Sequence, residues 1–136
     1  MLRNKLISAV LIGVGADIVE IDRIRIAVER SGDRFLERVF TFSERNFCDA
    51  KRDRFASYAA RFAAKEAVLK ALGSGLAGCG WKDVEISRVD GQRPEVLLHR
   101  AAADLAKEKG ISAVLVSMSH DRSRAVAFAV AAGEGV

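Results

Sequence analysis

The stretch Arg54–Leu72, RFASYAARFAAKEAVLKAL, is the longest helix that the sequence predicts. It is rich in alanine, lacks proline and glycine, and is followed by Gly73, a residue type that often ends helices in a left-handed conformation. A helix turns by about 100° per residue, which places four polar residues on one stripe, the pattern of a solvated face. The four residues are Arg54, Ser57, Arg61 and Lys65.

Two other polar residues of this helix, Glu66 and Lys70, lie about 100–140° away from the stripe, beside alanines and Phe62. A carboxylate without a partner on an apolar flank is costly. One possible partner for Glu66 is a metal ion. The alternative is an ordinary pair with Lys70, four residues on, worth about 0.2–0.5 kcal/mol on a helix surface. The spacing leaves both alternatives open.

Outward from this helix the sequence predicts a mixture of helices and strands. Before it we expect a core strand and three helices: Leu6–Val14, Ile18–Arg30, Asp33–Phe40, and a helix capped by Ser43 that runs to about Lys51. After it we expect a loop at Gly78–Gly80 and then two strands, Trp81–Arg88 and Arg93–Leu98, around the turn Asp90-Gly91. A helix follows over His99–Lys109, and the chain ends with an antiparallel pair of strands, Ala113–Ser119 and Ala125–Ala131. This order has too few βαβ units for a doubly wound sheet. It predicts one α+β domain over residues 1–136, with a mainly antiparallel sheet packed on one long helix.

The composition predicts a folded domain with an acidic partner. Half of the 136 residues are hydrophobic, which is enough for a core. The net charge of +4 favours nucleic acid, an anionic membrane or an acidic protein. Few aromatic residues and no dense run of lysine and arginine argue against a nucleic-acid-binding surface. Cys48 and Cys79 have no metal-binding spacing; they indicate a reducing compartment and are expected to be packing residues.

The N-terminus imitates a signal peptide, because Arg3 and Lys5 precede the apolar run Leu6–Ala16. The run is short, is interrupted by polar residues and glycines, and continues directly into the acidic segment Asp17–Asp22. No other stretch reaches the roughly 20 apolar residues of a membrane span. We therefore expect a buried strand, no membrane association and a cytoplasmic protein.

A first candidate site lies in the segment Gly13–Ile21, GVGADIVEI. Its glycines let a backbone approach a bulky ligand closely. A carboxylate where a core strand ends, here Asp17, is a common way to hold a hard ion such as Mg²⁺. The alternative is that Asp17 caps the following helix, and the spacing decides neither. A dinucleotide fingerprint is excluded, since its third glycine is missing.

A second candidate lies in Val116–Asp121, VSMSHD, which suggests a Ser/His/Asp hydrolase. Adjacent residues at a strand end diverge, so Ser119, His120 and Asp121 do not form a triad among themselves. The chain also lacks the G-x-S-x-G turn of such enzymes. The plainer alternative is that His120 is a turn residue bonded to nearby backbone.

Together these segments resemble the acyl carrier protein synthase family of phosphopantetheinyl transferases. The matching residues are Gly13-x-Gly15-x-Asp17-Ile18, Arg61-Phe62-Ala63-Ala64-Lys65-Glu66-Ala67 with Lys70 and Gly73-x-Gly75, and Val116-Ser117-x-Ser119-His120. They follow the family's order over nearly the whole chain. Arg93-Pro94 departs from the family's more usual Gly-Lys-Pro turn, and the residues between Thr41 and Arg54 match loosely.

The resemblance implies a phosphopantetheinyl-transferase-like fold and a reaction. A Mg²⁺-dependent homotrimer would move 4'-phosphopantetheine from coenzyme A to a serine of an acidic acyl carrier protein, releasing 3',5'-ADP, in fatty acid biosynthesis. The implied catalytic residues are Asp17, Glu66 and Lys70, of which Asp17 and Glu66 bind the metal. Lys65 and Lys70 would face the diphosphate, and the coenzyme A site would also include Arg61, Gly73 and, from a neighbouring subunit, His120. Arg23 and Arg30 would face the carrier.

Two questions stay open at this stage. The serine proton has three candidate acceptors: Glu20, Asp17 or a metal-bound water. The main competing function is a basic, non-enzymatic module that binds an acidic protein or nucleic acid; it explains the charge but not the carboxylates Asp17 and Glu66.

Overall fold

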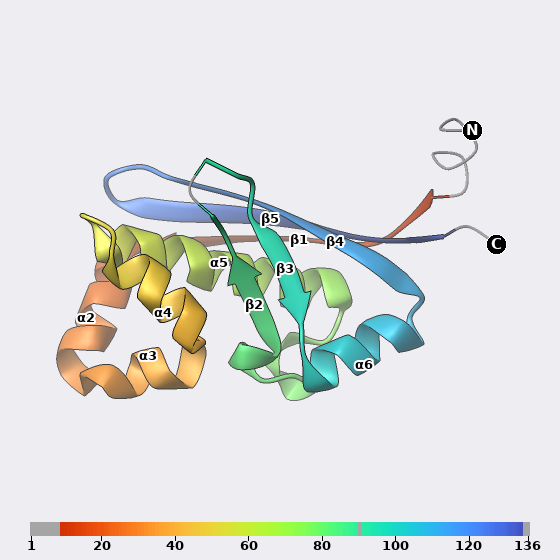
Figure 1. Cartoon of the computed structure of the whole chain (residues 1–136), viewed down its shortest axis with the longest axis horizontal. Coiled ribbons are helices and arrows are strands. Elements are labelled where there is room, and N and C mark those ends of the chain that lie inside the picture. Colours follow the sequence, from red (N-terminus) through yellow and green to blue (C-terminus); the bar gives the residue numbers. More distant parts are fainter. Residues whose placement is uncertain (1–8, 90, 135–136) are drawn as a thin grey trace.

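A three-stranded antiparallel sheet and one long helix form the two main layers of the molecule (Figure 1). The computed structural model describes residues 9–89 and 91–134. Their helices and strands are β1 (Ala9–Glu20), α2 (Ile21–Ser31), α3 (Asp33–Val39), α4 (Phe42–Asp49), α5 (Arg54–Leu72), η1 (Gly75–Ala77), η2 (Trp81–Asp83), β2 (Val84–Ser87), β3 (Glu95–Leu98), α6 (Arg100–Glu108), β4 (Ile111–His120) and β5 (Arg124–Glu134).

Strand β5 is the centre of the sheet, with β1 on one side and β4 on the other. Side chains of a strand alternate between its faces, and the first four inward positions of β5 are all alanine. These four alanines, Ala125, Ala127, Ala129 and Ala131, are buried. Helix α5 packs on the same face, where it contacts all three strands. Small side chains on this face therefore let the helix lie close to the sheet.

The glycines of β1 bring that strand directly against α5. A Cβ atom on Gly13 would lie 1.9 Å from the carbonyl oxygen of Ala71, and one on Gly15 would lie 1.9 Å from that of Ala67. Both separations are far below a normal contact, so only glycine fits. We expected these glycines to admit a ligand; in the structure they admit the long helix.

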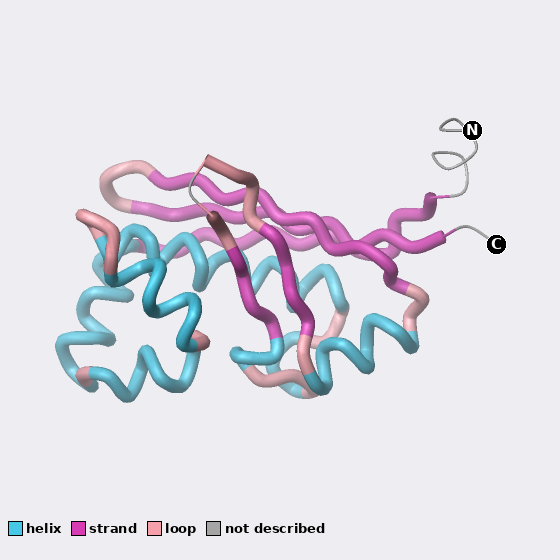
Figure 2. The backbone as a smooth tube through the Cα atoms, viewed as in Figure 1, coloured by secondary structure: helices cyan, strands magenta, loops and turns pink. Residues whose placement is uncertain are grey.

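The remaining elements lie along α5. Helices α2, α3 and α4 gather at one end of the molecule, while the β2–β3 pair crosses α5 and leads into α6 (Figures 1 and 2). Thr41 begins α4 with a capping box: the Thr41 side chain accepts from the Glu44 amide, and the Glu44 carboxylate accepts from the Thr41 amide. The expected cap at Ser43 is therefore wrong by two residues.

The α+β class, the antiparallel sheet on one long helix and the bounds of α5 are confirmed. Gly73 ends α5 with φ of 79°, as expected. Strand β1 is longer than predicted and runs through Glu20, so the next helix begins at Ile21 rather than Ile18. Asp17 thus lies inside a strand, and the alternative that it caps the helix is wrong.

One further element differs in detail. The first residues of the predicted strand Trp81–Arg88 form a 3₁₀ turn, and β2 begins at Val84. The start of the predicted strand Leu6–Val14 and the turn residue Asp90 fall outside the described residues. Both cysteines are buried, as expected of packing residues. Within residues 9–89 and 91–134 no helix combines the length and apolarity of a membrane span.

The prediction that β1 is a buried strand is wrong for its outer face. Val14 and Ile18 are 66% and 60% exposed. On the neighbouring strands, Leu115 is 55% exposed and Phe128 56%. These four residues lie on the sheet face opposite α5, because the inward positions alternate with them along each strand. We call this surface the open sheet face.

Candidate active site

Asp17 and Glu66 meet at one pocket, although they come from β1 and α5. Asp17 follows Gly13 and Gly15 at the next inward position of β1, and the contact of these glycines with α5 sets its distance from the helix. The pocket has a volume of about 330 Å³ and also contains Arg23 of α2. Its other walls are apolar: Ile18, Val19, Ile24, Ala27, Phe35 and Phe62.

The two carboxylates repel each other across the pocket. Partial burial raises the pKa of Glu66, the negative charge of Asp17 raises it further, and Lys70 opposes both effects. The Lys70 ammonium donates to the Ala16 carbonyl at 2.9 Å and lies 3.5 Å from the Asp17 carboxylate. Lys70 therefore pairs with Asp17, and the expected alternative of a Glu66–Lys70 pair is wrong. In the described part of the chain, no hydrogen bond or ion pair holds the Glu66 carboxylate.

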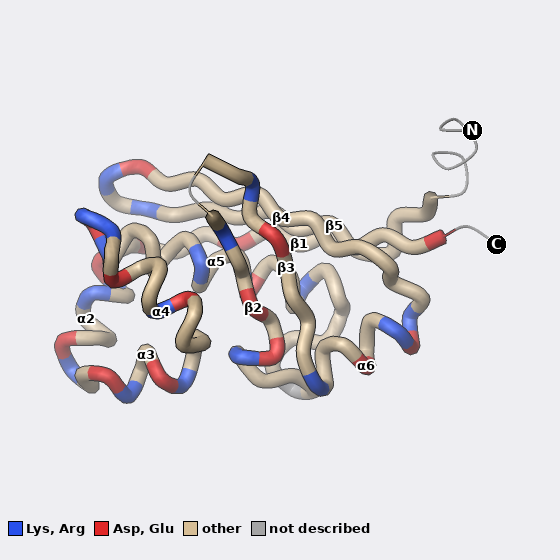
Figure 3. Tube along the Cα trace, in the orientation of Figure 1, with Lys and Arg blue, Asp and Glu red and all other residues tan. Residues whose placement is uncertain are grey.

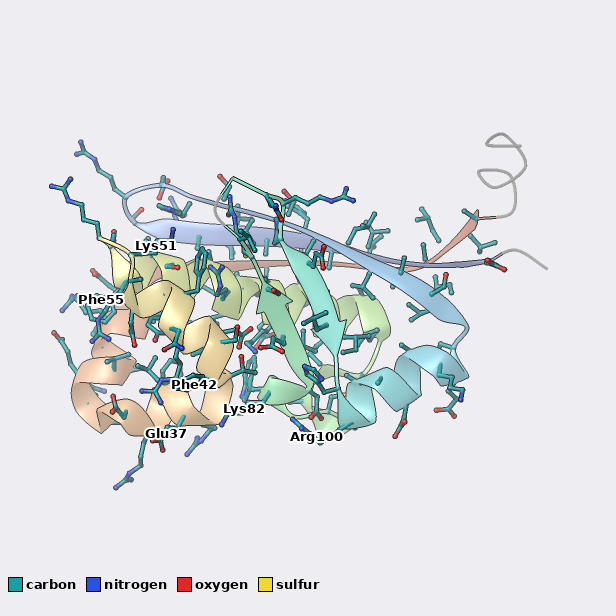
Figure 4. The ribbon with its side chains drawn as sticks, in the orientation of Figure 1. Glu37, Phe42, Lys51, Phe55, Lys82 and Arg100 are labelled. Carbon is teal, nitrogen blue, oxygen red and sulfur yellow. The ribbon has the colours of Figure 1, made fainter. Side chains whose placement is uncertain are left out.

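A second pocket, of about 340 Å³, lies where α5 faces β4. It is rich in positive charge: Lys51, Arg52, Arg61 and Arg88 line it, together with His120. Figure 3 shows lysines and arginines at the end of α4 and in the β4–β5 turn, and Figure 4 labels Lys51 just after α4. The arrangement is that of an anion-binding pocket.

Arg61 is the buried cation of this second pocket. Its side chain is not on a solvated stripe, as the sequence suggested, but is 2% exposed. One guanidinium nitrogen donates to Ser57 at 3.3 Å, and the group lies 4.1 Å from the centre of the Phe47 ring. Its Nε and Nη2 atoms have no hydrogen-bond partner among the described residues. Burial lowers the pKa of Arg61, and donors of this kind suit an anion.

Lys65 lies in neither pocket. The side chain is fully buried, and its ammonium group contacts the Glu44 carboxylate at 2.7 Å. It also donates to the carbonyls of Trp81, at 3.1 Å, and Val84, at 2.6 Å. All three of its N–H donors are thus used inside the protein. The prediction of a solvated position is wrong, whereas the contact of Lys65 with a diphosphate stays a prediction.

Glu44 is the buried partner of Lys65, and the sequence interpretation missed it. A signal for it exists, because Thr-x-x-Glu is the pattern of a capping box. The pattern shows that Glu44 lies at a helix start, but not that its carboxylate is fully buried against Lys65.

His120 lies at the exposed end of β4, with Nδ1 3.2 Å from the carbonyl oxygen of Asp121. The Asp121 carboxylate accepts from the amides of Ser123 and Arg124, which holds the β4–β5 turn and lowers the pKa of Asp121. Asp121 thus holds the turn, and His120 lies against nearby backbone, as the plainer alternative for His120 supposed.

The remaining predicted residues lie apart from these pockets or at their edges. Arg23 lines the first pocket, and Arg30 lies in the last turn of α2. Gly73 serves the end of α5: a Cβ atom there would lie 2.6 Å from the Lys109 ammonium, which caps the Leu72 carbonyl. Of the described side chains, no group of three or more histidines, cysteines, aspartates or glutamates converges as a metal site.

The two pockets lie on opposite flanks of α5. Glu66 belongs to the pocket on the β1 side, and His120 to the pocket on the β4 side. Strand β5 separates β1 from β4. A single chain therefore does not bring Glu66 and His120 together.

Comparison with known proteins gives the chain its family. A family model described as the 4'-phosphopantetheinyl transferase superfamily matches residues 13–129. The holo-[acyl-carrier-protein] synthase of Desulforudis audaxviator is 53% identical over 123 residues, which cover 90% of this chain and 94% of that protein. The synthase of Moorella thermoacetica is 48% identical over 120 residues, covering 88% and 93%.

Solved structures of holo-[acyl-carrier-protein] synthases are similar to this chain as well. The holo-[acyl-carrier-protein] synthase of Neisseria meningitidis superimposes with a TM-score of 0.83 at 33% identity, covering 90% of this chain and 98% of that chain. That of Helicobacter pylori, solved in complex with coenzyme A, gives a TM-score of 0.76 at 34% identity, covering 87% and 98%. The chain therefore belongs to the 4'-phosphopantetheinyl transferase superfamily and, within it, to the holo-[acyl-carrier-protein] synthases.

Proposed function

We propose that the protein transfers the 4'-phosphopantetheine group of coenzyme A to a serine hydroxyl of an apo acyl carrier protein and releases 3',5'-ADP. One observation carries the proposal: Asp17 and Glu66 meet at one pocket, with Lys70 beside them. The relatives support it, since the Helicobacter pylori and Bacillus anthracis synthases were solved in complexes with coenzyme A.

The residues of the first pocket fit Mg²⁺. The ion prefers oxygen ligands and is usually held by one or two carboxylates together with substrate phosphates. Asp17 and Glu66 would hold it, and the Glu66 carboxylate has no other partner among the described residues. When bound there, Mg²⁺ would neutralise negative charge on the diphosphate oxygens.

The protein's own groups supply the rest of the chemistry. Phosphoryl transfer depends mainly on positioning and on charge neutralisation at the phosphate oxygens. Lys70 is held by the Ala16 carbonyl at the edge of the site, yet its side chain is 52% exposed, so it can approach a diphosphate. Of the two carboxylates considered for the serine proton, only Asp17 lines this pocket, whereas Glu20 lies exposed at the end of β1. Of these two carboxylates, Asp17 is therefore the better placed to take the serine proton.

The second pocket would take the nucleotide end of coenzyme A. That end carries a phosphate on its ribose, and the buried Arg61 offers two unpaired donors to such a group. His120 and Arg88 line the same pocket. Arg61 and His120 would thus bind the nucleotide, while Asp17 and Glu66 would act at the diphosphate.

The separation of the two pockets implies a site between chains. In a ring of three chains whose open sheet faces point inward, the β1 edge of one chain lies beside the β4 edge of the next. The first pocket of one chain then lies beside the second pocket of its neighbour. Covering the open sheet face in this way would bury apolar surface, and heterologous contacts of this kind close naturally into a ring. We therefore propose a homotrimer.

The carrier would dock on α2. Arg23 reaches the first pocket, and Arg30 lies seven residues on, which is two helical turns along one face. A chain with a net charge of +4 attracts an acidic protein. We place this activity in fatty acid biosynthesis in the cytoplasm.

Mass spectrometry of a carrier protein tests the function. The protein is incubated with coenzyme A, Mg²⁺ and apo acyl carrier protein, and we expect the carrier to gain the mass of one phosphopantetheine group. Omission of Mg²⁺, with EDTA present, should prevent the gain. No gain with any of several apo carriers would contradict the proposal and favour the basic binding module.

A further inference from the structure

A buried ion pair, one residue from Glu66 along α5, joins four elements. The Glu44 carboxylate accepts from the amide of Thr41 at 2.8 Å with one oxygen and from that of Ile86 at 2.7 Å with the other. Lys65 contacts the same carboxylate at 2.7 Å and holds two carbonyls, one in η2 and one in β2. Both side chains are 0% exposed. The network thus fixes α5 against α4, η2 and β2.

Stability alone does not explain this pair. Replacing a buried ion pair by apolar residues of similar size is often neutral or even stabilising, whereas hydrogen bonds of fixed direction restrict how elements pack. Lys65 donates in three directions to three different elements. Rotation of α5 about its axis would break these bonds, so the network defines one rotation of the helix.

The rotation of α5 decides where Glu66 points. Lys65 and Glu66 are neighbours on the helix, about 100° apart around its axis. A rotation of about 20° would move a side-chain end at a radius of about 5–6 Å by about 2 Å. Metal sites tolerate deviations of only about 0.2 Å in ligand distance. Since no hydrogen bond or ion pair among the described residues holds the Glu66 carboxylate itself, the helix sets its position.

We propose that Glu44 and Lys65 are positioning residues: their ion pair fixes the rotation of α5 and thereby holds the Glu66 carboxylate opposite Asp17. The proposal rests on the proposed function for the role of Glu66. It assigns Lys65 an internal role in place of the diphosphate contact that the family resemblance implied.

The test compares Lys65→Met, Glu44→Gln and the double variant Glu44→Gln/Lys65→Met with the wild type. The probe is Mn²⁺ alone, with free Mn²⁺ measured by electron paramagnetic resonance, and Glu66→Gln marks complete loss of the site. We expect each single variant to bind Mn²⁺ about tenfold or more weakly, as is usual when a residue that orients a ligand is removed. In the transfer assay kcat should fall by a similar factor, while the KM for coenzyme A changes less than threefold.

The double variant and a matched control separate positioning from stability. The double variant leaves no unpaired buried charge, so its Tm should recover above that of Lys65→Met while Mn²⁺ affinity stays low. Leu69→Ala removes a buried side chain on the same face of α5, one turn further on, and leaves the ion pair intact. It should lower the Tm but keep Mn²⁺ affinity and kcat within twofold of the wild type.

Three results would overturn the proposal. One is a folded Lys65→Met that binds Mn²⁺ and turns over within twofold of the wild type; if that variant does not fold, Glu44→Gln and the double variant give the same test. Another is a raised KM for coenzyme A in Lys65→Met but not in Glu44→Gln, which would show that Lys65 contacts the diphosphate. The third is a loss of Mn²⁺ affinity in Leu69→Ala equal to that in Lys65→Met. A wild type without transferase activity would instead refute the proposed function, and Mn²⁺ binding would still decide the positioning role.

Discussion

Replacing Gly15 by alanine tests whether the glycines of β1 serve the packing of α5. The new Cβ atom would lie 1.9 Å from the Ala67 carbonyl oxygen and 2.9 Å from the Lys70 Cβ atom. Ordinary contacts begin at 3.4 Å, so strand and helix must separate by about 1.5 Å at this point. Overpacking of this kind costs about 1–3 kcal/mol. In a domain of this length that corresponds to a fall in Tm of about 3–15 °C.

The same displacement should reach the active site. Asp17 is the next inward residue of β1 after Gly15, so a strand pushed away from α5 carries Asp17 away from Glu66. A misplacement of about 1 Å can cost about 100-fold in rate. We therefore expect kcat in the carrier assay to fall at least tenfold, with calorimetry on the same sample giving the Tm.

Gly80→Ala is the matched control. At Gly80 the nearest atom to a new Cβ is 3.7 Å away, in the Asp83 carboxylate, and the backbone φ is −82°. Its Tm should stay within about 2 °C of the wild type. The reasoning would be refuted if Gly15→Ala also kept its Tm and kcat and only the KM for coenzyme A rose. That result would mean that Gly15 admits the ligand rather than the helix.

Three further predictions concern charged residues. Asp17→Ala and Glu66→Ala should each abolish transfer, while the Tm of the metal-free protein in EDTA holds or rises because the two carboxylates no longer repel each other; a Tm well below the wild type would contradict this. The raised pKa of Glu66 means that its ionisation destabilises the fold as pH rises from the ordinary value of 4.5 through the folded-state pKa. In calorimetry of the metal-free proteins, the Tm of Glu66→Gln minus that of the wild type should therefore increase as the pH rises above 4.5. A Tm difference that stays constant from pH 4 to 8 would contradict this prediction. Charge reversal at Arg23 and Arg30 should raise the KM for the carrier but not for coenzyme A, and salt should weaken the wild-type reaction; equal losses for both substrates would show that α2 is not the carrier surface.

The sequence was a good guide wherever local chemistry decides the structure. The long helix and its glycine end follow from alanine content and from the position of Gly73, and both are present. The two carboxylates were identified separately, one after a strand and one on an apolar flank of a helix. That they meet in one pocket depends on the register of β1 against α5, which no short-range pattern contains.

The polar stripe of α5 shows where local reasoning fails. Arg61 and Lys65 have the spacing of a solvated face, yet both are buried because α4, η2 and β2 cover that side. Helical periodicity shows which residues share a face but not what packs on that face. A charged residue there is stable when a distant partner is buried with it, and Glu44 lies 21 residues before Lys65 in the chain.

Mixing two inactive variants tests most directly whether the active site is built from two chains. Glu66→Ala and His120→Ala, each weak or inactive alone, are unfolded and refolded together in equal amounts. If Glu66 of one chain works with His120 of its neighbour, random assembly leaves about one site in four whole. The account predicts activity near a quarter of the wild type in the mixture. Activity no greater than the sum of the two variants, in a sample shown to contain mixed oligomers, would contradict it, as would a monomer by sedimentation.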